Sequence, residues 1–147
     1  MTGPLAAFGE GQQWADNRVL KVVNKDGGIF IKELNKRLPV KLAVVDTQSD
    51  PTKAAEAAAK LFLQDKVDIM DVSMTPETVN PVAAQCERYG VPCVSLGAPV
   101  EAWLQGGPYK WTYHQFFTFE QATGAYLDLC ELGPTNKKLG MVFPNDQ

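Results

Sequence analysis

The stretch that decides the fold is KVDIMDVSMTPETVNPVAAQCERYGVPCVSL, residues 66–96. It contains two short apolar runs, Val67–Val72 and Pro92–Leu96, which are typical of buried strands. Between them, Thr75-Pro76-Glu77 predicts the start of a helix, because proline at the first helical position has no amide hydrogen to lose. Gly90 predicts its end. A strand, a helix and a second strand in this order indicate a βαβ unit with parallel strands.

The same alternation continues on both sides of this unit. Asp50-Pro51 predicts another helix start, with aspartate as the capping residue. The pattern therefore predicts an α/β fold: a doubly wound, mainly parallel sheet with helices on both faces. The further helices are expected over Gly11–Asn24, Thr52–Gln64 and Gln121–Glu131, the further strands over Lys41–Asp46 and Lys138–Phe143, a short extended segment over Lys110–Tyr113, and a loop over Gly97–Pro108.

Composition narrows the class of protein. The chain has 147 residues, 45% of them hydrophobic, and a formal net charge of −3. This describes one soluble domain with enough apolar material for a core. A mildly acidic chain without clustered Lys and Arg argues against nucleic acid as a partner. No apolar run approaches the ~20 residues that a membrane-spanning helix needs.

The start of the chain does not resemble a secretory leader. Met1 is followed by Thr2-Gly3-Pro4 rather than by a charged and then an apolar segment. We therefore expect either that a leader has been removed or that the protein is cytosolic.

The cysteines are odd in number: Cys86, Cys93 and Cys130. An odd count excludes complete pairing within one chain. Cys86 and Cys93 lie on either side of a predicted helix-to-strand turn, so one interpretation is a disulfide between them. The other is that the cysteines are buried thiols that act as small hydrophobic residues.

Several segments, in one order along the chain, carry a family resemblance. They are Thr2–Gly9 (TGPLAAFG), Asn24–Ile29 (NKDGGI), Asp46–Pro51 (DTQSDP), Gly90–Ser95 (GVPCVS) and Met141–Asp146 (MVFPND). Together they resemble the type I periplasmic binding proteins related to the branched-chain amino-acid binders. Thr75–Pro81 looks like a divergent branch of that family.

The resemblance implies a function and a domain organisation. Residues 1–147 would form the amino-terminal ligand-binding lobe, with the family's first strand and second lobe absent from this chain. The lobe would belong to the substrate-binding subunit of an ABC importer, a non-catalytic protein of the periplasm or another extracytoplasmic compartment. Its partners would be an amino acid or similar small carboxylate and the importer's membrane subunits, and it would need no cofactor. The alternative is a ligand-sensing domain of a receptor or regulator, since both use this fold.

The predicted sheet also places a ligand site. In open parallel sheets, ligands bind beyond the carboxyl ends of the strands. There, Thr75, Pro76 and Thr78 begin a helix whose free N–H groups favour an anion, and Ser73 adds a hydroxyl. Ordinary helix capping explains the same residues without a ligand. Glu77 would compete with a ligand carboxylate or pair with a ligand amine.

The remaining candidate ligand-binding residues lie in neighbouring loops. Gly97 and Ala98 follow the strand Pro92–Leu96. The resemblance places Phe8 over the ligand, whereas Trp103 and Phe116 fit either binding or core packing. We expect Trp111 and Phe119 to belong to the core. At Pro76 and Pro99 the branched-chain binders carry serine and threonine, respectively, which suggests a less polar or differently oriented ligand here.

Motifs of enzymes are weak in this chain. Gly9-Glu10-Gly11 begins a dinucleotide-binding pattern that fails at Trp14. His114 is the only histidine, and we expect a surface or hinge residue rather than a catalytic base. One histidine with scattered cysteines predicts no metal site. Finally, an absent first strand would leave an open slot in the sheet, so we expect this chain to self-associate.

Overall fold

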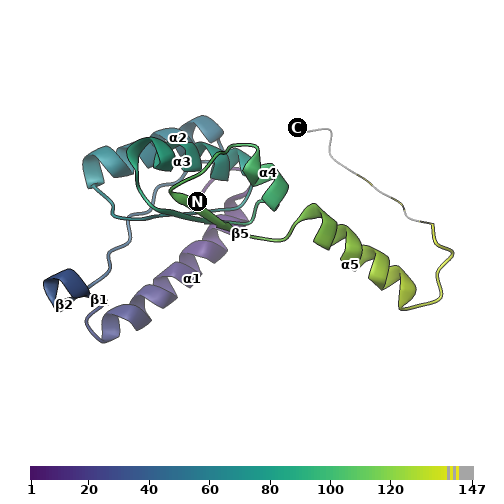
Figure 1. The fold of residues 1–147 in the computed structure, drawn as a ribbon, viewed down its shortest axis with the longest axis horizontal. Helices are drawn as coiled ribbons and strands as arrows, with labels where there is room; N and C mark the ends of the chain where they lie inside the picture. Colours follow the sequence, from purple (N-terminus) through teal and green to yellow (C-terminus); the bar gives the residue numbers. More distant parts are fainter. Residues whose placement is uncertain (139, 141, 143–147) are drawn as a thin grey trace. The chain divides into compact units, whose positions relative to one another are not determined.

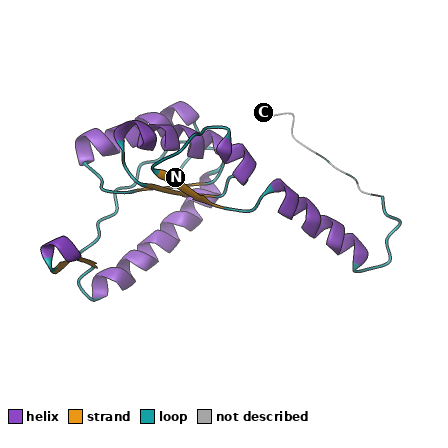
Figure 2. Cartoon of the chain, in the orientation of Figure 1, coloured by secondary structure: helices purple, strands orange, loops and turns teal. Residues whose placement is uncertain are grey.

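The computed structural model describes residues 1–138, 140 and 142. The chain divides into two compact units, residues 1–116 and 117–147, which are considered separately. The first unit is built on a parallel sheet of β3 (Met70–Ser73), β4 (Cys93–Leu96) and β5 (Thr112–Gln115), in that order. The predicted parallel α/β architecture is confirmed (Figures 1 and 2).

Helix α3 (Pro76–Tyr89) connects β3 to β4 as the sequence predicts. Pro76 occupies the first helical position, and Gly90 ends the helix in the left-handed region at φ = 68°. Helix α2 (Pro51–Lys60) begins at Asp50, whose carboxylate accepts a hydrogen bond of 2.8 Å from the Lys53 N–H. A π-helical turn, Leu61–Asp65, extends α2 towards β3.

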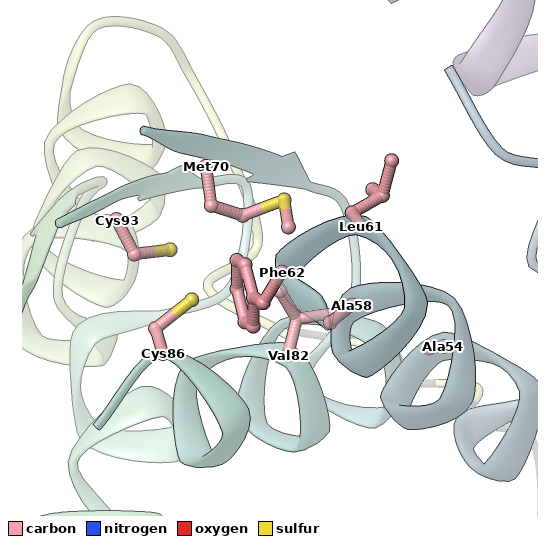
Figure 3. Close-up of a cluster of buried hydrophobic side chains, with 8 residues drawn as sticks. All are labelled: Ala54, Ala58, Leu61, Phe62, Met70, Val82, Cys86 and Cys93. Carbon is pink, nitrogen blue, oxygen red and sulfur yellow. The ribbon is translucent and has the colours of Figure 1, made fainter. Parts of the chain in front are cut away.

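The core lies between these two helices and the sheet (Figure 3). Ala54 and Ala58 line the buried face of α2, where small side chains let α3 approach closely. Phe62 packs against Tyr89 with ring centroids 5.6 Å apart. The buried members of this cluster are Ala54, Ala58, Leu61, Phe62, Met70, Val82, Cys86 and Cys93.

The amino-terminal part differs from expectation. Helix α1 spans Ala6–Lys25 and so begins earlier than predicted. It is followed by an antiparallel pair, β1 (Ile29–Ile31) and β2 (Lys36–Leu38), which the sequence pattern does not predict. The Asn24 side chain then joins α1 to the chain after β2: its amide N–H donates to the Val40 carbonyl, and its oxygen accepts from the Val40 N–H, both at 2.8 Å.

The strand predicted over Lys41–Asp46 is wrong. This segment has no regular secondary structure, and Leu42 and Val44 are exposed. The physical reason is that this segment bonds to no neighbouring strand. Strand β3 is hydrogen-bonded to β4 on one side, and within the described residues nothing pairs with the other side of β3. An apolar sequence alone cannot make a strand without a neighbouring backbone to bond to.

A groove of about 1450 Å³ lies along the unpaired edge of β3. Its walls are α1, the segment 38–46 and β3 itself. The N–H groups of Met70 and Met74 bond to carbonyls of the β4 side. Since successive residues of a strand point their backbone groups in opposite directions, Asp71 and Ser73 direct theirs towards the groove.

Three further elements differ from the prediction. The region Gly97–Pro108 is predicted as a loop, but it contains the short helix α4 (Val100–Leu104). The extended segment expected at Lys110–Tyr113 is β5, displaced by two residues. The strand expected over Lys138–Phe143 includes residues 139, 141 and 143, which lie outside the described residues.

The second unit contains α5 (Phe119–Glu131), which has a capping box. The Thr118 hydroxyl accepts from the Gln121 N–H at 3.1 Å, and the Gln121 side chain accepts from the Thr118 N–H at 3.0 Å. These two bonds satisfy donors at the start of the helix. They explain why α5 begins two residues before the predicted Gln121.

Glu87 of α3 fixes the start of β5. Its carboxylate accepts hydrogen bonds from the backbone N–H groups of Lys110, Trp111 and Thr112 at 2.8, 2.6 and 2.9 Å. Desolvation tends to raise the pKa of Glu87, but these backbone donors outweigh it, and the net pKa lies below its ordinary value. The carboxylate therefore stabilises the folded chain only while it is ionised.

We expect Glu87→Gln to lower the free energy of unfolding at pH 7 by about 1 kcal/mol, because a charged acceptor is lost from a site that water partly screens. The lowered pKa fixes the pH dependence. The stabilisation is complete above the pKa of the unfolded chain and disappears as pH falls through the folded value. Urea unfolding at pH 7 and pH 3 measures it. The exposed Glu56→Gln on α2 is the matched control, and an equal loss in both variants would contradict this role.

We also expect the chain to self-associate through the unpaired edge of β3, with a second copy as the partner. Unpaired backbone groups beside an apolar groove recruit another strand. Sedimentation velocity should show species larger than the monomer at micromolar concentration. Asp71→Pro should reduce them, because it removes an N–H that faces the groove and leaves the bonds to β4 intact. A monomer at all concentrations would refute this expectation.

Candidate functional site

The loops that follow β3 and β4 meet at the carboxyl edge of the sheet. Ser73 is the register partner of Leu96, and the Met74 N–H donates to the Leu96 carbonyl at 3.1 Å. Gly97 has φ = 95°, and a Cβ there would lie 2.8 Å from the Met74 carbonyl oxygen. Only glycine fits such an approach. The structure thus brings together Ser73 and Gly97, as the sequence predicted.

The start of α3 carries an unused hydroxyl. Thr75 has the extended backbone of a capping residue, but its side chain makes no capping hydrogen bond. Its Oγ1 is buried and has no hydrogen-bond partner among the described residues. The Thr78 N–H bonds to the Thr75 carbonyl at 3.0 Å. Simple side-chain capping, the alternative interpretation of Thr75, therefore does not describe this helix end.

Further polar groups line the groove. They come from β3 and α3, with Ser73 and Thr78, and from two amino-terminal segments, with Thr2 and Ser49. The Ser49 hydroxyl accepts from the Leu5 N–H at 3.1 Å.

Thr2 is held by Asp46. The Thr2 hydroxyl donates to the Asp46 carboxylate at 2.7 Å, which lowers the pKa of Asp46, with help from the Gln48 N–H. Thr2, Asp46 and Ser49 were not among the predicted site residues. The signal that pointed to them was their position in two segments that carry the family resemblance.

A stack of rings supports the loop after β4. His114 Nε2 lies 2.7 Å from the Ala98 carbonyl, and Nδ1 lies 2.8 Å from Ser95 Oγ. A carbonyl oxygen can only accept, so Nε2 is the protonated nitrogen. The Trp103 ring stacks on His114 at 4.9 Å, and Tyr109 stacks on Trp103 at 4.6 Å.

His114 therefore acts as a fixed support rather than a free surface residue. Ser95 is fully buried, so the Ser95–His114 pair is not arranged as an exposed nucleophile and base. The pair instead holds Ala98, which is also fully buried. For Trp103, the structure favours the packing interpretation, although its indole Nε1 is buried without a hydrogen-bond partner among the described residues.

The other aromatic candidates do not line the groove. Phe8 is 59% exposed on α1 and is not among the residues that line the groove. Phe116 follows β5 and is 39% exposed. Trp111 and Phe119, expected in the core, are 36% and 53% exposed, so that expectation is wrong. The Lys110 ammonium lies over the Trp111 ring, 5.7 Å from its centroid, which suits a partly exposed indole.

Metal-binding clusters and membrane-spanning helices are both absent from the described residues. None of their His, Cys, Asp and Glu side chains form a cluster of three or more that could hold a metal ion. Among their helices, none combines the length and apolar character needed to cross a membrane.

Comparisons with solved structures show the fold. The leucine-binding protein LivK from Thermotoga maritima matches with a TM-score of 0.68 and 24% identity, over 88% of this chain and 35% of LivK. The branched-chain amino acid transporter substrate-binding protein LivJ from Streptococcus pneumoniae, in complex with isoleucine, gives 0.67 and 24%, over 80% of this chain and 31% of LivJ.

A third structure has a different ligand. A solute-binding protein of an ABC transporter from Rhodopseudomonas palustris, in complex with 3,4-dihydroxybenzoic acid, gives a TM-score of 0.62 and 19% identity, over 82% of this chain and 31% of that protein. The chain thus spans about a third of the length of these structures. No curated protein sequence matches it.

A family profile described as "Periplasmic binding protein" matches residues 1–147. That match covers the whole chain, and the parallel sheet with its crossing loops has the fold of the solved proteins of this type. The chain belongs to the periplasmic binding protein family, and it has the type I fold.

Proposed function

We propose that this chain is the amino-terminal lobe of the substrate-binding subunit of an ABC importer. Its ligand would bind at the carboxyl edge of β3 and β4, beside the start of α3. The observation that carries the proposal is the buried, unpartnered Thr75 hydroxyl at this helix end. Buried polar atoms normally have hydrogen-bond partners, so an unused one next to two strand ends is a candidate ligand contact.

The proposed ligand is an amino acid or similar small carboxylate. The positive end of the α3 dipole favours a negative charge beside the start of this helix. Ser73 and Thr78 lie on the groove wall at this end and can add hydroxyl donors. Isoleucine and 3,4-dihydroxybenzoic acid, bound by two of the similar proteins, differ in shape but share a carboxylate. That shared group is the chemistry that this helix end suits.

The proposed mechanism is non-catalytic. A second lobe would close over the ligand, and the membrane subunits of the importer would recognise the closed form outside the cytoplasm. The single lobe supplies only part of the contacts. The hydrogen bond from Met74 to Leu96 and the close approach of Gly97 connect the two loops of this part. Loops that are already connected lose less conformational entropy when the ligand arrives, which favours binding.

The proposal predicts weaker binding when the hydroxyls at the start of α3 are removed. In a polypeptide that carries both lobes, we expect one of three probes, leucine, isoleucine or 3,4-dihydroxybenzoate, to bind by calorimetry. Replacing Thr75 and Thr78 together by alanine should then weaken binding by about 1–3 kcal/mol, because hydrogen bonds to a charged ligand are lost.

Thr52→Ala is the matched control, since Thr52 is exposed on α2. It should leave the affinity unchanged. Circular dichroism would show whether each variant keeps its fold. A folded Thr75/Thr78 double variant with undiminished affinity would place the site elsewhere. Failure of all the carboxylate probes, tested with the unaltered protein, would refute the proposed ligand class.

A further inference from the structure

The two buried cysteines between α3 and β4 form a pair that no part of the proposed binding site uses. Cys86 lies near the end of α3, and Cys93 is the first residue of β4. We propose that this pair is a redox site: folding in the presence of a small-molecule disulfide oxidises it to an intramolecular Cys86–Cys93 disulfide. The inference needs only the two thiols and that oxidant, so it stands independently of the proposed ligand and transport function.

Their side chains occupy one space. Figure 3 shows both sulfur atoms pointing into the gap between α3 and β4. The structure holds both as free, buried thiols. Both residues are fully buried. The geometry therefore keeps each sulfur next to the other and away from the bulk solvent.

Backbone hydrogen bonds fix the two ends of the pair. The Cys86 carbonyl accepts from the N–H groups of Gly90 and Val91, the latter at 3.0 Å. The Cys93 N–H donates to the Trp111 carbonyl at 2.9 Å. These hydrogen bonds fix the backbone at Cys86 and at Cys93, so the two side chains stay beside each other. The third cysteine takes no part in this arrangement. Cys130 belongs to α5 in the other unit and is only partly buried.

The reaction is thiol–disulfide exchange with glutathione disulfide. One cysteine thiolate attacks a glutathione sulfur, forming a mixed disulfide and releasing a glutathione thiolate that takes up the proton. The second cysteine thiolate then attacks the protein sulfur of the mixed disulfide and releases the second glutathione. The two cysteines lose two electrons and two protons in total, and glutathione disulfide is reduced to two glutathione molecules.

Burial of the two thiols determines whether the exchange takes place during folding or in the folded protein. The hydrogen bond from Cys86 and the desolvation of the site both raise the pKa of Cys93. A thiol that rarely ionises and has no solvent access exchanges slowly. The native reduced pair is therefore protected, whereas the same thiols in an unfolded or folding chain react freely. Oxidation then accompanies folding rather than following it.

The disulfide would join α3 to β4 at the end of the sheet opposite the proposed ligand site. The site uses the start of α3 and the loop after β4, whereas Cys86 and Cys93 lie at the other end of each element. A cross-link here limits the freedom of the unfolded chain without altering the ligand contacts. It should thus raise the thermal midpoint and leave ligand affinity unchanged.

Trypsin separates the three cysteines, which makes the test direct. Cleavage after Lys66, Arg88, Lys110 and Lys137 places Cys86 in peptide 67–88, Cys93 in peptide 89–110 and Cys130 in peptide 111–137. The full chain is reduced in urea, refolded with glutathione and glutathione disulfide, blocked with N-ethylmaleimide in urea at mildly acidic pH and then digested. A parallel sample is refolded with reductant only.

We expect mass spectrometry to find peptide 67–88 joined to peptide 89–110 after oxidative refolding, with Cys130 alkylated. The oxidised chain should run as a monomer on a non-reducing gel and melt several degrees above the reduced one. Cys130→Ala, the control, should keep the link, and Cys86→Ala should abolish it. When the native reduced chain is treated with iodoacetamide, Cys130 should react before the pair.

Two results would overturn the proposal. One is the recovery of all three cysteines as blocked thiols when the oxidatively refolded chain is unfolded in urea together with the blocking reagent. The other is a predominant link that involves peptide 111–137. Both are read from unaltered protein, so they do not depend on whether a cysteine variant folds.

Discussion

Parallel pairing of β3, β4 and β5 is the constraint on which the rest of the structure depends. The aligned register of Met70, Cys93 and Thr112 places the carboxyl ends of the strands at one edge. Each strand must therefore be followed by a chain segment that leaves from this edge, and the segments after β3 and β4 meet there. The contact of Gly97 with the Met74 backbone is a result of that crowding. Helix α3 begins at the same edge, which brings its unused hydroxyl beside both loops.

The sequence predicted what is decided by short-range chemistry. Asp50-Pro51, Thr75-Pro76 and Gly90 locate helix ends because capping and proline geometry act within one turn. The position of Ser73 beside Gly97 followed from parallel connectivity. The role of His114 could not be predicted, because it depends on Ser95, Ala98 and Trp103, which only the folded sheet brings to it. Likewise, Thr2 and Asp46 are joined across a large sequence separation.

The segment Lys41–Asp46 shows the limit of apolar patterns. Its composition fits a buried strand, yet strand formation also needs backbone donors and acceptors on a neighbour. Here the groove separates it from β3, and Leu42 and Val44 stay exposed. The misplacement of Phe119 has another cause. The sequence does not show whether another element covers an aromatic residue at the start of an amphipathic helix. In α5, Phe119 is 53% exposed.

Because β3 is hydrogen-bonded on one side only, its backbone amide hydrogens fall into two classes of exchange rate. Amide hydrogens that face β4, such as that of Met70, are shielded by the ladder. Those of Asp71 and Ser73 face the groove and lack this shield. Amide exchange along β3 would therefore alternate between slow and fast from one residue to the next, whereas β4, bonded on both sides, would be slow throughout. Fast exchange at Asp71 and Ser73 would therefore show that the edge of β3 is uncovered, and slow exchange there would show that it is covered.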